Sequence, residues 1–270
     1  MNTPFFTTVT RIADVETNGF EVAPLPHDDW ATGDYVICEV QGRPGPLYQI
    51  ERPSGRMCQV FDGDHVVGAL GTRAATLEGV GGWRDVDADG AMHALTGAGL
   101  FGKATSVSPL LPPLMRLQYG GHLMREGGKL TMRGFCAEVA PLALDMPVIL
   151  LIGTSMSAGK TASGRVIVHE LAQMGLKVAA AKLTGAARFR DMLSWKDAGA
   201  ADVFDFVDVG LPSTVCPPED FGPLLTELLS KIAATGADVL VAEAGASPLE
   251  PYNGSVAMQM IDDKVRMMVL

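Results

Sequence analysis

Cysteine is scarce in this chain of 270 residues, which contains only four. The four lie far apart and form no C-x-x-C pair, so the sequence predicts neither a disulfide framework nor a zinc site. We interpret them as reduced core thiols. They are Cys38, Cys58, Cys136 and Cys216.

Positive charge and long apolar runs are also lacking. The chain has 21 Lys and Arg against 31 Asp and Glu, a formal net charge of −10. Nucleic-acid surfaces need clustered Lys and Arg, so we expect no nucleic-acid partner. No apolar run approaches the roughly 20 residues of a membrane-spanning helix, and the N-terminus has no basic segment followed by a long apolar one. We therefore expect a soluble, cytoplasmic protein without a membrane partner.

Two common catalytic patterns are missing as well. The histidines form no H-x-x-H or H-x-E pattern, and no G-x-S-x-G elbow occurs. The sequence therefore favours neither a histidine metal site nor a serine nucleophile. The histidines are His27, His65, His93, His122 and His169.

In the first half of the chain, the sequence predicts short strands separated by turns. Its length is comfortable for two domains, and up to about residue 140 strand-like segments alternate with turn residues such as "RPSGR", "DADG" and "EGGK". We expect a small β-rich domain over residues 1–140, either a barrel or a sandwich. The strand-like segments are 34–40, 57–61, 65–71, 101–107, 114–125 and 129–135.

The second half follows a different pattern. After a connection over 138–147, apolar runs such as "PVILLIG" and "ADVLVAEAG" alternate with helical stretches such as "PEDFGPLLTELLSKIAATG". Strands that are apolar on both faces indicate a parallel sheet with helices on both faces. We therefore expect an α/β domain over residues 147–270, with ligands at the carboxyl ends of its strands.

Two stretches compete as a phosphate-binding loop. "GAGLFGKA" (97–104) has the usual spacing but lies among turns, runs into a strand-like segment and ends on Ala104, which has no hydroxyl. "GTSMSAGKT" (153–161) follows "VILLI" and opens a helical stretch. Because a phosphate loop joins a buried strand to a helix N-terminus, we assign it to 153–161, although Gly153 stands one place early and Thr154 occupies the usual glycine position.

"GTSMSAGKT" resembles the G-T-x-x-x-x-G-K-T loop of dethiobiotin synthetase, whose P-loop class includes the nitrogenase iron protein and MobB-type nucleotide-binding proteins. Threonine in the second place is normal in that class. The resemblance implies a P-loop (Rossmann-like) domain that binds ATP or GTP with Mg²⁺. The implied nucleotide-binding residues are Gly153, Thr154, Ser155, Ser157, Ala158, Gly159, Lys160, Thr161 and Ala162.

Two further stretches fall where this resemblance expects functional residues. "AAAKLTG" ends one strand, and Lys182 would match the substrate-facing lysine. "VLVAEAGASPLEP" ends a later strand, and Glu243 would match a carboxylate associated with magnesium. The D-A dipeptide expected between them is supplied by Asp197. The resemblance thus assigns catalysis to Lys160, Lys182 and Glu243, and the metal to Thr161, Asp197 and Glu243.

The stretches "KLTGAA", "DFVD" and "EAGASPLEP" also resemble the family known as domain of unknown function 1611. The "DFVD" stretch makes Asp205 a competitor of Asp197. The sequence departs from that family at Ala244 and Ala246, which replace glycines, and at Glu250, which replaces a histidine. Both resemblances cover the second half only.

Each role has a structural alternative. Lys160, on a solvent-facing loop, would reach the β- and γ-phosphates, and Thr161 would ligate Mg²⁺ or simply start the helix. Lys182 would bind a substrate anion or extend from a strand end. Glu243 follows four apolar residues, where an unpaired carboxylate is unfavourable, so it would organise a metal or pair with Lys182.

We expect an NTP-dependent, ligase- or synthetase-like enzyme or an NTPase (a hydrolase) acting on a small carboxylate- or amine-bearing metabolite. One alternative is a nucleotide-binding adaptor in cofactor biosynthesis. Another is an acyltransferase whose loop holds the pyrophosphate of coenzyme A. We also expect a homo-oligomer, and a second domain truncated after "KVRMMVL" (264–270), since nothing follows it to carry a base-recognition loop.

Overall fold

The computed structural model describes residues 3–42, 49–155 and 158–270. It is a mixed α/β structure of two compact units. The first comprises residues 1–136 together with the short segments 186–188 and 210–213, and the second comprises 137–185, 189–209 and 214–270.

Short strands dominate the first unit. Ten of them form one sheet, in the order β1-β6-β3-β11-β9-β10-β8-β7, with β2 and β12 added along β11. An additional pairing of β6 with β10 closes the ladder β6-β3-β11-β9-β10 into a ring. The ten strands are β1 (Phe5–Phe6), β2 (Glu21–Ala23), β3 (Tyr35–Gln41), β6 (His65–Leu70), β7 (Thr72–Ala75), β8 (Gly79–Gly82), β9 (Ala91–Ala94), β10 (Leu100–Val107), β11 (Arg116–Arg125) and β12 (Gly128–Lys129). A separate hairpin pairs β4 (Gln49–Glu51) with β5 (Met57–Gln59).

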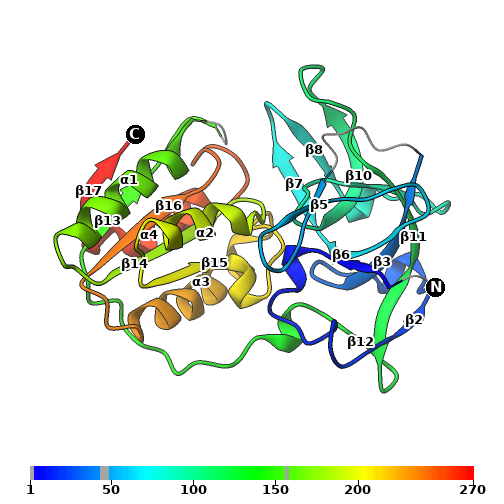
Figure 1. Ribbon diagram of the computed structural model, residues 1–270, viewed down its shortest axis with the longest axis horizontal. Coiled ribbons are helices and arrows are strands. Elements are labelled where there is room, and N and C mark those ends of the chain that lie inside the picture. The colour runs from blue at the N-terminus through cyan, green and yellow to red at the C-terminus, as the bar shows by residue number, and fades with distance from the viewer. Residues whose placement is uncertain (1–2, 43–48, 156–157) are drawn as a thin grey trace. The chain divides into compact units, whose positions relative to one another are not determined.

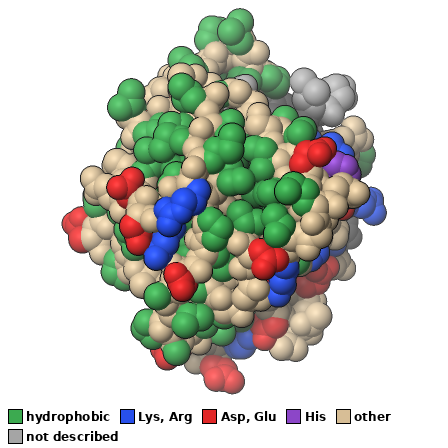
Figure 2. Space-filling view, turned by 90° about the vertical axis from the view of Figure 1, so that its left-hand side faces the viewer, with side chains coloured by type: hydrophobic (Ala, Val, Ile, Leu, Met, Phe, Trp, Pro, Cys, Tyr) green, Lys and Arg blue, Asp and Glu red, His purple; other side chains and the backbone are tan. Residues whose placement is uncertain are grey.

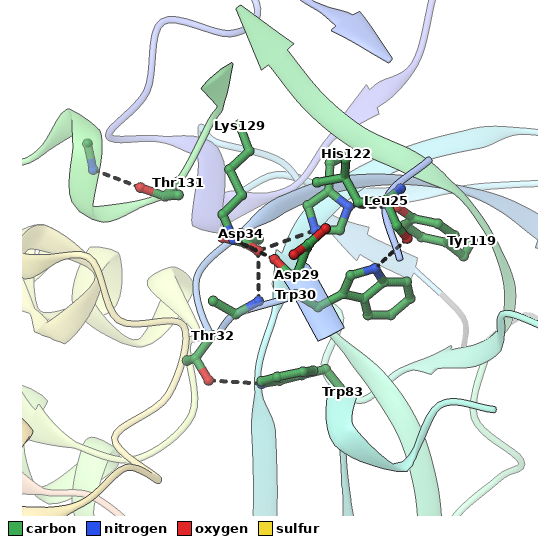
Figure 3. A network of polar contacts seen from close by, with 12 residues as sticks. Leu25, Asp29, Trp30, Thr32, Asp34, Trp83, Tyr119, His122, Lys129 and Thr131 are labelled. Carbon is green, nitrogen blue, oxygen red and sulfur yellow. Dashed lines mark hydrogen bonds and ion pairs between the residues drawn. The ribbon is translucent and has the colours of Figure 1, made fainter. Parts of the chain in front are cut away.

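A buried polar network lies beside the core of this unit (Figure 3). Asp34 Oδ2 accepts a hydrogen bond from Lys129 Nζ at 2.7 Å and lies 3.3 Å from His122 Nε2. The other ring nitrogen of His122 lies 2.6 Å from the Tyr119 hydroxyl, and the Tyr119 ring packs against Trp30. Side chains that are wholly or nearly wholly removed from water need such partners, so the network ties β11 and β12 to the segment before β3.

The second unit is built on a five-stranded sheet in which every pairing is parallel, in the order β15-β14-β16-β13-β17. The described part of this unit contains four α-helices beside the sheet (Figure 1). The strands are β13 (Val148–Leu151), β14 (Val178–Thr184), β15 (Asp202–Asp205), β16 (Val239–Ala244) and β17 (Val265–Val269). The helices are α1 (Lys160–Gln173), α2 (Phe189–Asp197), α3 (Pro218–Ala233) and α4 (Gly254–Ile261). The described residues also form six 3₁₀ turns, at Thr8–Thr10, His27–Asp29, Trp83–Asp85, Arg133–Phe135, Phe206–Val209 and Asp262–Lys264.

Both faces of the central strands are covered. Every residue of β14 is buried, as is every residue of β16. Val178 and Ala180 pack with Val168 of α1 and Trp195 of α2. The alternate β14 residues point to the opposite face of the sheet and are buried as well, and α4 contacts β14 and β16 while packing against α3. This agrees with the near-continuous apolar runs of the sequence.

Strand β17 is an edge of this sheet, paired with β13 among the described residues. Its side chains are mostly exposed, and Met267 and Met268 are 54% and 48% accessible. Figure 2 shows hydrophobic side chains gathered across the face on which this strand lies. No helix of the described residues is both long enough and apolar enough to cross a membrane.

The structure changes three sequence expectations. The stretch 129–135 holds the short strand β12 and then a 3₁₀ turn. The apolar run "VFDFVDVG" (203–210), whose composition predicts a strand, is strand only as far as Asp205 and continues as a 3₁₀ turn. Helix α2 was not expected. The competing stretch 97–104 runs into β10 with no helix after it, and its Lys103 pairs with Asp87.

Candidate functional site

The loop between β13 and α1 joins a buried strand to a helix, as predicted. Strand β13 ends at Leu151 and α1 begins at Lys160. Gly159 precedes the helix with a φ of 92°, a left-handed conformation that favours glycine. Met156 and Ser157 lie outside the described residues, so the predicted role of Ser157 has no structural counterpart here. Of the other predicted loop residues, Thr154, Ala158, Gly159 and Ala162 are exposed.

We expected Lys160 on a solvent-facing loop; the neighbouring loop residues are exposed, but Lys160 itself is buried. Its side chain folds back over Gly153, where an added Cβ would lie 3.2 Å from Lys160 Cγ. Its Nζ donates a hydrogen bond to the Ser155 carbonyl at 2.7 Å. Burial lowers the pKa of the Lys160 ammonium, opposed by the carboxylate of Glu243. The loop therefore holds a cation at its centre, removed from water.

Thr161 and Glu243 meet at the carboxyl edge of the sheet. Glu243 lies in β16 opposite Leu151, the last residue of the neighbouring β13. The Thr161 hydroxyl donates a hydrogen bond to Glu243 Oε2 at 2.9 Å. Glu243 is buried, so the hydroxyl satisfies part of the hydrogen-bonding demand of its carboxylate. The expected convergence of these two residues is confirmed.

Lys182 lies directly opposite Glu243 on the adjacent strand β14. Its Nζ donates a hydrogen bond to Asp191 Oδ2 at 3.1 Å, and on its other side it pairs in register with Asp205 of β15. Burial acts to lower the pKa of the Lys182 ammonium, but the carboxylates of Asp191 and Glu243 outweigh burial and the pKa is raised. Lys182 therefore belongs to the same cluster of charges as Lys160. The partner of its ammonium is Asp191, so the simple Lys182–Glu243 ion pair that we considered does not form.

Asp197, which we expected to serve the metal, does not join this cluster. It is the exposed last residue of α2, and the chain beyond it returns to the sheet where the Ala201 amide bonds to the Val178 carbonyl, at the amino end of β14. The physical reason is the direction of α2, which begins near the carboxyl edge and ends at the opposite one. Asp191, in its first turn, is the aspartate that reaches the site.

The turns that follow β14 and β16 are closely packed. A Cβ at Gly245 would lie 2.1 Å from the Thr184 carbonyl oxygen, so only glycine fits there. The Thr184 hydroxyl donates to the Gly245 carbonyl at 3.0 Å. Ala246, at a position where the resembled family has glycine, adopts a φ of 62°, and such strain in a non-glycine residue concentrates at functional sites.

Glu250 follows this turn and contributes to the charge of the site. Its Oε2 accepts a hydrogen bond from the Ser247 amide at 2.9 Å, and its carboxylate acts to raise the pKa of Lys160. The residue that stands in place of a family histidine thus adds negative charge near the loop.

The described residues contain no group of three or more His, Cys, Asp and Glu side chains arranged to hold a metal ion. A metal at this edge would therefore need ligands besides protein carboxylates. Thr161 and Glu243 offer it one hydroxyl and one carboxylate in direct contact.

Comparison with known proteins gave no relative: no family model, no curated protein and no solved structure matches the chain.

Proposed function

We propose that residues 147–270 form a P-loop (Rossmann-like) domain that binds ATP or GTP with Mg²⁺ and uses the nucleotide in chemistry on a small anionic metabolite. The observation that carries this proposal is the contact between Thr161 and Glu243, 2.9 Å apart, beside the buried ammonium of Lys160. A hydroxyl after the loop lysine and a carboxylate on the neighbouring strand are the groups that hold magnesium in P-loop nucleotide sites.

The charge at the loop supports a phosphate ligand. The molecule carries a net charge of −10, so an anion must be attracted by a local device. Lys160 and the amino end of α1 supply positive charge at the same place. The Lys160 ammonium bonds to a loop carbonyl, and a phosphate oxygen would be a stronger, charged acceptor for it.

The donor set at the carboxyl edge fits Mg²⁺. Magnesium prefers oxygen ligands, is reluctant to lose its water and is often held by one or two protein oxygens together with phosphates. Thr161 would ligate it directly, and Glu243 would bind directly or through a water. When bound, the ion would neutralise charge on the transferred phosphoryl group.

Lys182 and its acidic partners support a second ligand. Lys182 lies next to Glu243 in register, yet its ammonium bonds to Asp191 instead of to the loop. A carboxylate or phosphate of a metabolite would compete with Asp191 for this ammonium. In that arrangement Lys160 binds the nucleotide, Lys182 orients the metabolite, and the buried position of both lysines limits access of water.

Isothermal titration calorimetry with ATP, GTP and coenzyme A, each with and without Mg²⁺, tests the proposal. We expect magnesium-dependent binding of at least one triphosphate to the wild type, and loss of that binding in Lys160→Ala. Lys196→Ala, which removes an exposed lysine of α2, is the matched control and should bind as the wild type does. Binding that is equal in wild type and Lys160→Ala would refute the assignment.

Two other results would redirect the proposal. Binding of coenzyme A without a requirement for Mg²⁺ would favour the acyltransferase alternative. Nucleotide binding without turnover of any member of a panel of small carboxylic acids and amines would favour an adaptor.

A further inference from the structure

Helix α2 holds the first turn of α1 through Trp195. The buried indole donates a hydrogen bond from Nε1 to the Thr161 carbonyl at 2.8 Å. Its ring also lies against Gly164, where an added Cβ would be 2.5 Å from Trp195 Cζ2. Glycine inside a helix is less stable than alanine by about 1 kcal/mol. Gly164, which is unfavourable for helix stability, therefore lies where the indole of Trp195 approaches the backbone of α1.

The same helix contacts Lys182 one turn earlier. Asp191 is in the first turn of α2, and its carboxylate accepts the hydrogen bond of Lys182 Nζ. Residues four apart lie on one face of a helix. Asp191 and Trp195 therefore face the site together, one toward the end of β14 and the other toward the start of α1.

These contacts form a closed series that connects Thr161, Glu243, Lys182 and helix α2. The Thr161 hydroxyl bonds to Glu243, and Glu243 stands opposite Lys182 on the paired strand. Lys182 bonds to Asp191, and Trp195, on the same helix, bonds back to the carbonyl of Thr161. The hydroxyl and the carbonyl of Thr161 are thereby held by elements that also contact Lys182.

We propose that α2 couples the two ends of the site, with Trp195 as the positioning residue. An anionic group of the second ligand that binds Lys182 would release Asp191, shift α2 and change the hold of Trp195 on the first turn of α1. This inference rests on the proposed function, because the first turn of α1 is where magnesium and phosphate would bind. Coupling of this kind is reciprocal, so nucleotide binding would also change the affinity at Lys182.

A double-mutant cycle tests the coupling, with the affinity for Mg·ADP measured by calorimetry. Asp191→Asn removes the charge that attracts Lys182 and so weakens this contact, and Trp195→Phe keeps an apolar ring but removes the N–H donor. We expect Asp191→Asn to change the dissociation constant of Mg·ADP by about fivefold or more, and by less than about twofold in the Trp195→Phe background. Asp197→Asn, an exposed change in the same helix, should have no effect.

The cycle separates coupling from a simple change of charge. If Asp191 acted on the nucleotide only through its field, the effect of Asp191→Asn would be the same with and without the indole N–H, and the proposal would be overturned. An effect that disappears with Trp195→Phe supports transmission through α2.

Hydrogen exchange on the ligand-free protein gives a second measurement that does not depend on nucleotide. We expect faster exchange of the amides of residues 162–166 in Asp191→Asn and in Trp195→Phe, with no further increase in the double variant. Unchanged exchange in Asp191→Asn would contradict the coupling. A wild type that binds neither Mg·ADP nor Mg·GDP but shows the linked exchange would instead refute the proposed function and leave the mechanical link in place.

Discussion

Thr161 and Glu243 are 82 residues apart in the sequence, yet the hydroxyl of one donates a hydrogen bond to the carboxylate of the other at 2.9 Å. The sheet order explains this contact. Strand β16 lies beside β13, and Glu243 is in register with Leu151. The helix that follows β13 therefore starts where the last residues of β16 reach the edge. A metal-bound phosphate at the loop would meet both oxygens at once.

We predict that Glu243→Gln removes most of the benefit of Mg²⁺ for nucleotide binding. The amide keeps the size of the side chain but loses the charge that would hold the ion or its water. The affinity for Mg·ADP should fall by roughly tenfold or more, whereas the affinity for ADP in EDTA should be nearly unchanged. Calorimetry in the two buffers measures both values. Glu219→Gln, an exposed change in the first turn of α3, should behave as the wild type, and an unaltered magnesium effect in Glu243→Gln would contradict the metal role.

The pKa of Lys160 predicts a pH-dependent stability. Burial lowers this pKa from its ordinary value of 10.5, so a native molecule at neutral pH holds an ammonium in an unfavourable place. As the pH rises from the folded pKa toward 10.5, the native state gives up this proton before the unfolded state does, and the penalty declines. Lys160→Met should therefore have a higher free energy of unfolding than the ligand-free wild type at pH 7. This stability difference should become smaller as the pH approaches 10.5. Urea unfolding at several pH values measures this difference, and a stability difference that increases with pH would refute the prediction.

The contribution of Lys182 to stability should have the opposite sign to that of Lys160. Its pKa is raised above 10.5 because Asp191 and Glu243 outweigh burial, so its contribution to stability is fully present below that pH and is lost as the pH rises through the folded pKa. Lys182→Met should be less stable than the wild type at pH 7, by about 3–5 kcal/mol as for other broken buried ion pairs. The same urea titrations test it. Equal stability of variant and wild type at pH 7 would show that the buried carboxylates do not need this lysine.

The sequence predicted the second unit better than the first because its signals are stronger there. At 148–173 an apolar run is followed by glycines and then by a helical pattern, and this local sequence is enough to predict a strand, a loop and a helix. The strands of the first unit that were not foreseen are two to four residues long, and some contain few of the residue types that favour strands, as in β7 (TRAA) and β8 (GVGG). Their position depends on pairing with distant strands, for which the local sequence carries little signal.

The candidate site was predicted only where it follows a strand end. Lys182 and Glu243 stand at the carboxyl ends of buried strands, so parallel topology alone brings them together. Asp191 and Trp195 were missed because helix α2 was missed. Four charged residues occur in the nine residues of "FRDMLSWKD", and they obscure the apolar face of this helix in the sequence. The spacing of Met192 and Trp195, three apart, was the available signal.

Asp34 should be the most sensitive residue of the polar network in the first unit (Figure 3). Its Oδ2 accepts hydrogen bonds from Lys129 Nζ at 2.7 Å and from the Ala31 amide at 2.8 Å, and it lies 3.3 Å from His122 Nε2. Asp34→Asn removes the charge that these donors share, and the amide adds an N–H that has no acceptor in the network. We expect a loss of about 1–3 kcal/mol in the free energy of unfolding, measured in urea.

The control for this prediction lies five residues earlier in the chain. Asp29 is exposed, and it contributes to the network only its backbone carbonyl, which accepts a hydrogen bond from Lys129 Nζ at 2.8 Å. Asp29→Asn keeps that carbonyl and should change the free energy of unfolding by less than about 0.5 kcal/mol. If Asp34→Asn were equally harmless, Lys129 and His122 would have to find other acceptors. The ion pair between Lys129 and Asp34 would then be a consequence of the fold and would not help to hold β12 against the segment before β3.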